Sequence, residues 1–303
     1  MARYDVILLG SASCDLIFGG MASLPKLGEE LWTKEMDMMA GGMINSAAAM
    51  SRLGLRTGLA VEIGSDVWGE LILSELRKEG VGLEFIRQYP YPYPQVTVVL
   101  NHAGDRTFIS YSDRRHSKQF TEELVDVVRN SDASIYHITA QPEYANLIAD
   151  VRKMGKSISL DTVWDEDWLV SDEIRELIRF ADMFMPNLKE AQAITGKEDP
   201  LEALELLAEL APVVIIKLGE KGAIGKYAGQ VYRRTVRSVK QLDATGAGDC
   251  FAAGFIYGWL QRRDFGECLE IANFCGSCSV EKVGGYSGAP TLKELELAIP
   301  NRK

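Results

Sequence analysis

Residues 243–251 read DATGAGDCF, and the apolar run from Phe251 to Leu260 follows directly. Gly246 and Gly248 have no Cβ, so the backbone here can approach a ligand closely. The run predicts a helix over Gly246 to Gln261, with free N–H groups and a positive dipole end at its start. Asp249 falls in the first turn, where a carboxylate either accepts a proton from an attacking hydroxyl or merely favours the helix dipole. The stretch therefore predicts either an anion hole with a base beside it or a simple glycine turn.

Short apolar segments of strand length alternate with segments of helical periodicity along most of the chain, which favours right-handed crossovers and a mostly parallel sheet covered on both faces. The predicted strands are Asp5 to Leu9, Thr57 to Glu62, Ser134 to His137, Ser157 to Asp161, Met183 to Pro186, Val213 to Leu218, Ala223 to Tyr227 and Val231 to Thr235. The predicted helices are Asn45 to Leu53, Asp66 to Lys78, Thr121 to Asn130, Pro142 to Lys153, Asp172 to Phe180, Asn187 to Thr195, Pro200 to Glu209, Gly246 to Gln261, Phe265 to Lys282 and Thr291 to Ala298.

Two segments, at about 12–40 and 93–112, depart from this alternation because neither has a long helical face. The second alternates polar and apolar residues around Gly104-Asp105, as a half-exposed hairpin does. The preceding "YPYPYP", Tyr89 to Pro94, predicts a stiff connector, since proline cannot continue a central strand. We expect one domain over residues 1–303, with the two segments forming a small β lid at the ligand-binding edge of the sheet.

Composition excludes several classes of protein. The 303 residues are 47% hydrophobic, enough for a large core, and the net charge of −10 opposes binding to nucleic acid. The N-terminal apolar run is too short for a signal peptide or a membrane span. The five cysteines are an odd number and favour reduced thiols, so we expect a cytoplasmic protein without membrane association.

Four motifs in order resemble those of the ribokinase-like (PfkB) carbohydrate kinase family. They are "AGGMINSAAAMSRLG" with "IGSDVWGE" at residues 40–54 and 63–70, "NLKEA" at 187–191, "IKLGEKGA" at 216–223 and "DATGAGDCFAAGF" at 243–255. The resemblance implies a ribokinase-like three-layer α/β/α fold with a mostly parallel central sheet and a small β-sheet lid. It also implies transfer of the γ-phosphoryl group of ATP, with Mg²⁺, to a hydroxyl that is usually primary.

The resemblance assigns roles to individual residues. Asp249 is the implied base, and the backbone of Thr245, Gly246, Ala247 and Gly248 is the implied anion hole. Glu190 organises Mg²⁺ through water, and Asn187 lies beside the phosphates, although Asn187-x-x-Glu190 also fits a capping box. The remaining implied positions are Asp15, Gly41, Gly42 and Asn45 for the acceptor; Lys217, Gly219, Gly222 and Asn273 for the nucleotide; and Asp243, with Thr245, for a monovalent cation such as K⁺.

For two of these positions the residues alone leave a second interpretation open. Asp15 follows the first strand, where an aspartate is often a turn residue. Lys217 either touches a phosphate or is solvated.

The acceptor is not decided by the sequence. Arg106, Arg114 and Arg115 flank the proposed lid strand, where a guanidinium either pairs with a sugar acid or sugar phosphate or lies on the solvated face. A nucleoside is the alternative acceptor, because Phe18, Trp32, Met36 and Met43 could form an apolar ceiling. A non-catalytic metabolite-binding regulator is a further alternative.

The oligomeric state is predicted from the lid. Lid strands have exposed edges, and unpaired edges favour pairing with a second copy. A homodimer through the lid is therefore expected.

Overall fold

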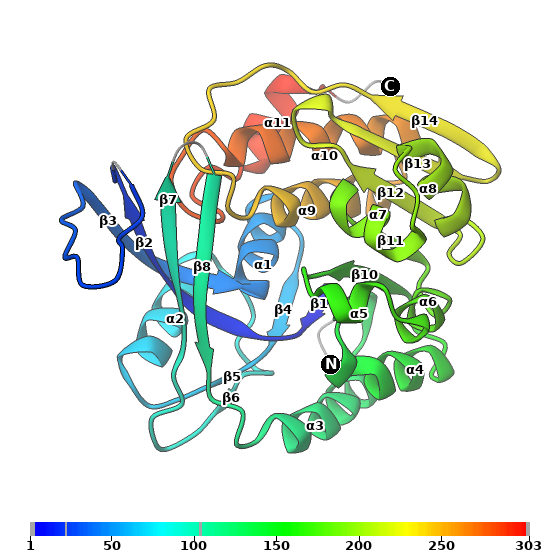
Figure 1. Cartoon of the computed structure of the whole chain (residues 1–303). Helices are drawn as coiled ribbons and strands as arrows, with labels where there is room; N and C mark the ends of the chain where they lie inside the picture. The colour runs from blue at the N-terminus through cyan, green and yellow to red at the C-terminus, as the bar shows by residue number, and fades with distance from the viewer. Residues whose placement is uncertain (1–3, 22, 103–104, 301–303) are drawn as a thin grey trace.

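The computed structural model describes residues 4–21, 23–102 and 105–300, and it is built around one large twisted sheet (Figure 1). Six of its strands, β4, β1, β9, β10, β11 and β12, pair in parallel, while β13 and β14 pair antiparallel at one edge. In spatial order they are β14 (Gln230–Arg234), β13 (Ala223–Tyr227), β12 (Val213–Lys217), β11 (Met183–Phe184), β10 (Ile158–Thr162), β9 (Ala133–Ala140), β1 (Tyr4–Leu9) and β4 (Thr57–Ala60). These are the eight strands that the sequence predicts, so the mostly parallel sheet is confirmed.

Helices cover both faces of the large sheet and bury two separate cores. One core contains residues of α1 (Met43–Arg52), α2 (Val67–Lys78), α9 (Ala247–Leu260), α10 (Phe265–Ser279) and α11 (Leu292–Ala298). The other contains residues of α3 (Ser117–Asn130), α4 (Ala145–Lys153), α5 (Glu166–Leu169), α6 (Asp172–Ile178), α7 (Leu188–Thr195) and α8 (Pro200–Leu207). Within β1, Val6 and Leu8 belong to the first core and Ile7 and Leu9 to the second, because successive side chains point to opposite faces. The three-layer arrangement is therefore confirmed.

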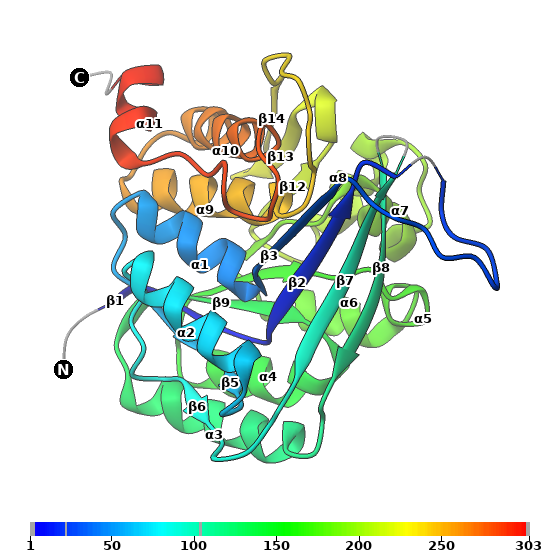
Figure 2. The same ribbon diagram turned by 90° about the vertical axis from the view of Figure 1, so that its left-hand side faces the viewer.

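A small separate sheet stands beside the large one (Figure 2). Its strands, in spatial order, are β3 (Glu35–Gly42), β2 (Ala12–Gly19), β7 (Gln95–His102) and β8 (Asp105–Ser112). β7 and β8 are antiparallel, with His102 opposite Asp105. Of the predicted turn between them, residues 103–104 lie outside the described part of the chain. Since β2 follows β1 after two residues and β3 leads directly into α1, the small sheet begins at the carboxyl end of the parallel strands.

The two faces of the small sheet differ in chemistry. Asp15 and Phe18 are three residues apart in β2, so their side chains project from opposite faces. Met36 lies directly opposite Phe18 and therefore shares its face. The apolar ceiling that we expect from Phe18 and Met36 is thus wrong, because strand alternation places both on the face away from Asp15.

Several local features differ from the predicted elements or were not predicted. The strand predicted over Thr57 to Glu62 is interrupted after β4, and β5 (Glu62–Ile63) pairs with β6 (Arg87–Gln88). Helix α5 was not predicted because its four residues are too few for a periodic pattern. Two short 3₁₀ helices, η1 (Pro142–Tyr144) and η2 (Gly219–Lys221), complete the described elements.

The Tyr-Pro connector does more than stiffen the chain. Tyr89 and Tyr93 are buried, and their hydroxyls donate to the two carboxylate oxygens of Glu62 at 3.0 and 2.9 Å. Arg115 donates to the carbonyl of Pro92 and lies over the Tyr91 ring. The connector is therefore attached to the body of the protein by its side chains as well as by its backbone.

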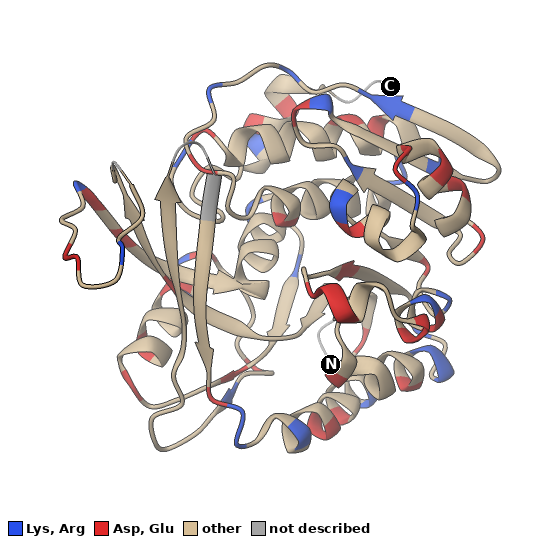
Figure 3. Cartoon of the chain, in the orientation of Figure 1, with Lys and Arg blue, Asp and Glu red and all other residues tan. Residues whose placement is uncertain are grey.

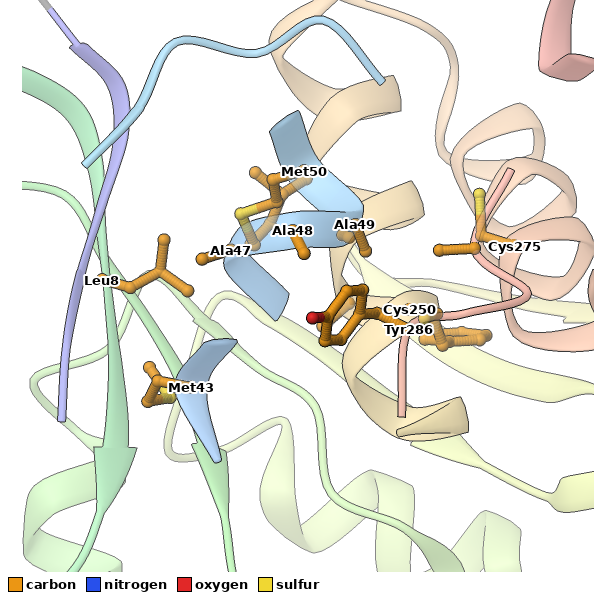
Figure 4. Packing of buried hydrophobic residues seen from close by; sticks show 14 of the residues in the cluster. Leu8, Met43, Ala47, Ala48, Ala49, Met50, Cys250, Cys275 and Tyr286 are labelled. Atoms are coloured by element: carbon orange, nitrogen blue, oxygen red, sulfur yellow. The ribbon is translucent and has the colours of Figure 1, made fainter. Parts of the chain in front are cut away.

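Helices α1 and α9 pack closely because α1 presents alanines at the contact. In Figure 4, Ala47, Ala48 and Ala49 lie between Leu8 of β1 on one side and Cys250 and Tyr286 on the other. Small side chains let helix backbones approach, and this approach brings the start of α1 to the start of α9.

The remaining sequence expectations concern thiols and membranes. All five cysteines are free, and Cys278 is the one that is not fully buried. Among the described residues, no helix has both the length and the apolar character needed to cross a membrane. Acidic and basic side chains are distributed over most of the ribbon, with an acidic group on α5 (Figure 3).

Candidate active site

The N-terminus of α9 is built on a glycine turn, as the sequence predicts. Gly246 is the N-cap with φ 69°, a left-handed conformation that side chains disfavour. A Cβ at Gly246 would lie 1.8 Å from the carbonyl oxygen of Gly285. The first α9 N–H to donate to a carbonyl four residues back is that of Cys250, to Gly246 at 2.9 Å. The N–H groups of Gly248 and Asp249 therefore belong to the unpaired first turn, where an anion is favoured.

Asp249 stands in this first turn with a donor on each carboxylate oxygen. Asn45 Nδ2 donates to Oδ2 at 3.2 Å, and Ser46 Oγ donates to Oδ1 at 2.9 Å. Burial raises the pKa of Asp249 to about 6, and the nearby charge of Asp161 adds to this rise. Both donors come from the first turn of α1, so the contact between the two helices fixes the orientation of the carboxylate.

Asn45 has one atom left over. Its Oδ1 is the single buried side-chain nitrogen or oxygen atom without a hydrogen-bond partner among the described residues. An unpaired buried acceptor is costly, and such atoms are found where a ligand or water completes the bond. This observation agrees with the substrate role that the resemblance implies for Asn45.

Lys217, at the end of β12, lies against the same helix terminus. Its Nζ donates to both carboxylate oxygens of Asp161 at 3.0 and 2.9 Å. A Cβ at Gly248 would lie 3.2 Å from this Nζ. Burial lowers the pKa of Lys217, but the charges of Asp161 and Glu190 outweigh burial and raise it. The side chain is 13% exposed, so the solvated alternative for Lys217 is wrong.

Asn187 and Glu190 form the capping box that the sequence allows. Asn187 Oδ1 accepts from the Glu190 N–H at 3.0 Å, and Glu190 Oε2 accepts from the Asn187 N–H at 2.7 Å. Glu190 is buried, and burial raises its pKa. Lys217 N donates to the carbonyl of Pro186 at 2.9 Å, so the box and the lysine share one edge of the sheet.

The small sheet contributes Asp15, Gly41 and Gly42. A Cβ at Gly41 would lie 2.2 Å from Asp15 Oδ2, so the carboxylate packs on this glycine. Asp15 lies within β2, so the turn interpretation is wrong. Burial raises the pKa of Asp15 to about 6, against the hydrogen bond from Ser13 Oγ at 2.9 Å.

A cavity of about 280 Å³ lies on the same face of the small sheet as Asp15, against the loop that leads to α9. Its polar lining residues are Glu35, Asp37, Asn101, His102, Gln241 and Asp243. The cavity is therefore bordered by acids from both the small sheet and the body.

The carboxylate of Asp243 organises the loop before α9. Oδ1 accepts from the N–H and hydroxyl of Thr245 at 2.9 and 2.7 Å, and Oδ2 accepts from the Gly284 N–H at 2.9 Å. Among the described residues, no group of three or more His, Cys, Asp or Glu side chains could hold a metal ion.

The residues expected at the nucleotide fall at two places. Gly219 is the first residue of η2 and Gly222 follows its last, with φ 61° and 85°, and a Cβ at Gly222 would lie 2.1 Å from Arg234 O. Asn273 is buried in α10, and its Nδ2 donates to the carbonyl of Arg234 at 3.1 Å. Asn273 thus holds the segment after β14, and its contact with adenine stays a prediction.

The arginines give no support to an anionic acceptor. Arg114 is 70% exposed and lies 3.6 Å from Glu143 of η1, and Arg115 pairs with Asp113. For each arginine the contact favours a position on the solvated face of the protein, and for Arg114 this opposes the predicted substrate role. The side chain of Arg106 lies outside the described part of the structure.

Sequence reasoning missed Ser46 and Asp161. A serine after Asn45 carries no distinguishing pattern, and its contact with Asp249 spans 203 residues of chain. Asp161 had a weak signal, since it ends a predicted strand at the edge where parallel strands place their ligands.

A family comparison identifies the chain. The model of the pfkB family carbohydrate kinases matches residues 29–292. The chain belongs to this family. As a member of this family it is a carbohydrate kinase. The resemblance that the four motifs indicate is thereby confirmed.

Relatives of this family member carry different substrate names. A 2-dehydro-3-deoxygluconokinase of Bacillus subtilis (strain 168) is 29% identical over 277 residues, covering 85% of each chain. The structure of Arabidopsis thaliana ribokinase complexed with ribose and ATP superimposes with a TM-score of 0.83 at 24% identity, covering 99% of this chain and 100% of that one. A Burkholderia thailandensis nucleoside kinase in complex with inosine gives 0.81 at 19% identity, covering 98% and 100%. The fold is thus shared, while the acceptors named for these proteins differ.

Proposed function

We propose that this carbohydrate kinase transfers the γ-phosphoryl group of ATP to a hydroxyl, usually primary, of a sugar or sugar-like acceptor, with Asp249 as general base. The observation that carries the proposal is the placement of the Asp249 carboxylate, which lies in the free first turn of α9 with Asn45 and Ser46 on its oxygens. A base and a set of N–H donors are thereby held at one point.

The residues at the start of α9 fit an anionic group. Gly246 and Gly248 carry no side chain, and the Lys217 ammonium adds a positive charge beside Gly248. In our proposal the oxygen of the acceptor hydroxyl forms a new bond to the γ-phosphorus while Asp249 takes the hydroxyl proton. The P–O bond to ADP breaks, and ADP leaves with the electrons of that bond. The N–H groups and Lys217 stabilise the charge on the phosphoryl oxygens.

Glu190 fits the place predicted for magnesium. Mg²⁺ keeps several waters and uses few protein carboxylates, so one buried glutamate beside the phosphate site suffices. When bound, Mg²⁺ would neutralise the negative charge that develops on the phosphate oxygens. Both oxygens of Asp243 already accept hydrogen bonds, Oδ1 from Thr245 and Oδ2 from Gly284, and the K⁺ site predicted there stays a prediction.

The acceptor end supports a polyhydroxylated molecule. Asp15 and the unpaired Oδ1 of Asn45 are hydrogen-bond acceptors, which suit hydroxyl donors. A nucleoside also carries such hydroxyls on its ribose, and the similarity to the kinase holding inosine favours it as the second candidate. A regulator without activity is less favoured, because the base, its two donors and Lys217 are all in place.

We further propose a single domain of residues 1–303 in which the small sheet acts as a lid, and a cytoplasmic homodimer formed through that sheet. The face away from Asp15 is apolar and exposed: Met36, Met38, Ile109 and Tyr111 are 58%, 45%, 64% and 63% exposed. A contiguous apolar face of this kind marks an interaction surface. A second copy would cover it with the same face.

The test is ADP release by the wild type and by Asp249→Asn against a panel of neutral sugars, sugar acids, sugar phosphates and nucleosides. We expect one acceptor class to be used, and the variant to lose roughly 10²–10⁴-fold in kcat because it cannot accept the proton. ATP affinity should stay nearly unchanged, since Asp249 adds a negative charge rather than a contact to the nucleotide.

Two further measurements show whether a loss of activity comes from the missing base rather than from a change in stability or in helix charge. Burial raises the pKa of Asp249 to about 6, so above that pH the ionised carboxylate makes the folded state less stable. Asp249→Asn lacks this charge and should therefore be more stable than the wild type at pH 8. That advantage should fade as the pH falls towards the unfolded value of about 4. Asp172→Asn removes a first-turn acid of α6, with its exposed ion pair to Arg175, and controls for the loss of such a charge away from the site. A wild-type rate in Asp249→Asn would show that Asp249 is not the base.

A further inference from the structure

The ion pair between Asp161 and Lys217 is the part of the site with no role so far. Asp161 comes from the end of β10 and Lys217 from the end of β12. Their side chains are 14% and 13% exposed, and the lysine Nζ donates to both carboxylate oxygens. An ion pair this deep is costly to form, so it needs an explanation beyond surface solvation.

The pair is located at the candidate phosphate site. The Lys217 Nζ lies beside Gly248, at 3.2 Å from the place a Cβ would occupy. An ammonium group has three N–H donors, and Asp161 accepts two of them. One donor therefore remains for an anion at the start of α9.

Without Asp161 this arrangement would be unfavourable. The ammonium would lie buried next to the positive end of α9, and both burial and the like charge would disfavour it. Glu190 is also close enough to favour the charged lysine, but its hydrogen bond is to the Asn187 N–H. Asp161 is thus the carboxylate that contacts the amine directly.

We propose that Asp161 is a positioning residue for phosphoryl transfer: it holds the Lys217 ammonium against the N-terminus of α9, with one N–H left for an oxygen of the transferring group. This inference rests on the proposed function. The competing explanation is that the pair merely ties β10 to β12 across β11, in which case its loss would affect stability and not the reaction.

A double-mutant cycle separates the two explanations. We would measure kcat, the KM for ATP, the KM for the acceptor and thermal unfolding for Asp161→Asn, Lys217→Met and the double variant. If Asp161 acts through Lys217, Asp161→Asn lowers kcat by about 10²-fold, comparable to loss of one preorganised donor, and leaves the acceptor KM unchanged. In the Lys217→Met background the same substitution should then cost almost nothing in kcat.

Asp161→Glu should recover part of the rate lost in Asp161→Asn, because it restores the charge at a slightly displaced position. Asp182→Asn is the control, since Asp182 likewise pairs with a basic side chain, that of Arg152, and accepts from the N–H of Ile158 in β10, but does not contact Lys217. We expect wild-type kcat for it.

Other results would overturn the inference. These are a wild-type kcat for Asp161→Asn, or losses that multiply in the double variant. If Asp161→Asn fails to fold with its unpaired ammonium, Asp161→Glu, Lys217→Met and the double variant decide. A reduced kcat for Asp161→Glu together with equal kcat values for the other two supports the inference, and a wild-type kcat for Asp161→Glu or a lower value for the double variant refutes it. Activity of Asp249→Asn would instead refute the proposed base, and the two failures are therefore distinguishable.

Discussion

The start of α9 and the small sheet form the two sides of the candidate active site, and they are built differently. At α9 the charged groups are buried and bonded: Asp249 has two donors, and Lys217 has a carboxylate. The small sheet has one polar face with acids around a cavity and one apolar face exposed to solvent. The charged groups of the first side are held by side-chain contacts between segments far apart in the chain, whereas the outer side chains of the second are exposed to solvent.

This difference predicts where the structure tolerates substitutions. Substitutions in the small sheet change side chains on an exposed element, while substitutions at α9 disturb several buried bonds at once. We therefore expect the largest losses at α9 and the smallest on the outer face of the small sheet.

The largest effect should come from Gly246→Ala. Its Cβ would overlap the carbonyl of Gly285 at 1.8 Å, so the backbone must move and the N–H donors move with it. We expect kcat to fall by at least about 10³-fold, as for loss of a complete set of preorganised donors. Thermal unfolding and steady-state kinetics would be measured together.

Gly155→Ala is the control for backbone conformation. Gly155 has the same φ of 69°, but a Cβ there meets nothing within 4 Å. It should cost about 1–2 kcal/mol in stability and leave kcat unchanged. Equal kinetic effects of the two substitutions would contradict the special role of the α9 turn.

An intermediate effect is expected for Ser46→Ala, measured as the pH dependence of kcat/KM, which reports the pKa of the base in the free enzyme. With the pKa of Asp249 raised to about 6, the wild-type rate should fall as the pH drops through about 6, because the base becomes protonated. The Ser46 hydroxyl favours the ionised form, so its removal should move this limb upward by roughly one pH unit.

Ser51→Ala is the matched control for this prediction. Ser51 lies on the same helix and donates to the carbonyl of Glu79 at 2.6 Å, away from Asp249. The acid limb should stay in place in this variant. A limb that also stays in place in Ser46→Ala would mean that the hydroxyl does not tune the base.

The smallest catalytic effect is predicted for Ile109→Glu on the outer face of the small sheet. A charge placed on this apolar face should dissociate the proposed dimer, as measured by light scattering, with kcat per subunit retained. Val231→Glu, an exposed apolar position on the edge strand β14, is the control and should leave the mass unchanged. A monomeric wild type, or dissociation by Val231→Glu instead, would exclude the proposed interface.

Much of the fold could be predicted because it depends on local patterns. Each strand of the large sheet is a short apolar run between turn residues, and each long helix has a periodic apolar face. The Asn187–Glu190 capping box was also readable, since its partners are three residues apart. Short elements such as α5 were not, because four residues carry no period.

The candidate site was only partly predictable for the same reason. The glycines before α9 and the acid in its first turn are neighbours in sequence, so the motif itself indicated an anion hole. Ser46 and Asp161 contact Asp249 and Lys217 across 203 and 56 residues, and no local pattern marks such contacts. The faces of the small sheet depended on strand register, and for this reason the ceiling expected from Phe18 and Met36 was wrong.

The sequence by itself determined the alternating architecture, the glycine turn into α9 and the family to which the chain belongs. Each of these depends on short patterns of residues that are neighbours in the sequence. The tertiary structure alone decided which side chains meet Asp249, that Lys217 is buried on a carboxylate, and which face of the small sheet looks into the cavity. These are matters of packing and register, where a contact depends on how distant elements fit together. DATGAGDCF therefore supplies the proposed base, Asp249, and the fold around it supplies the hydrogen-bond donors and the charges beside its carboxylate.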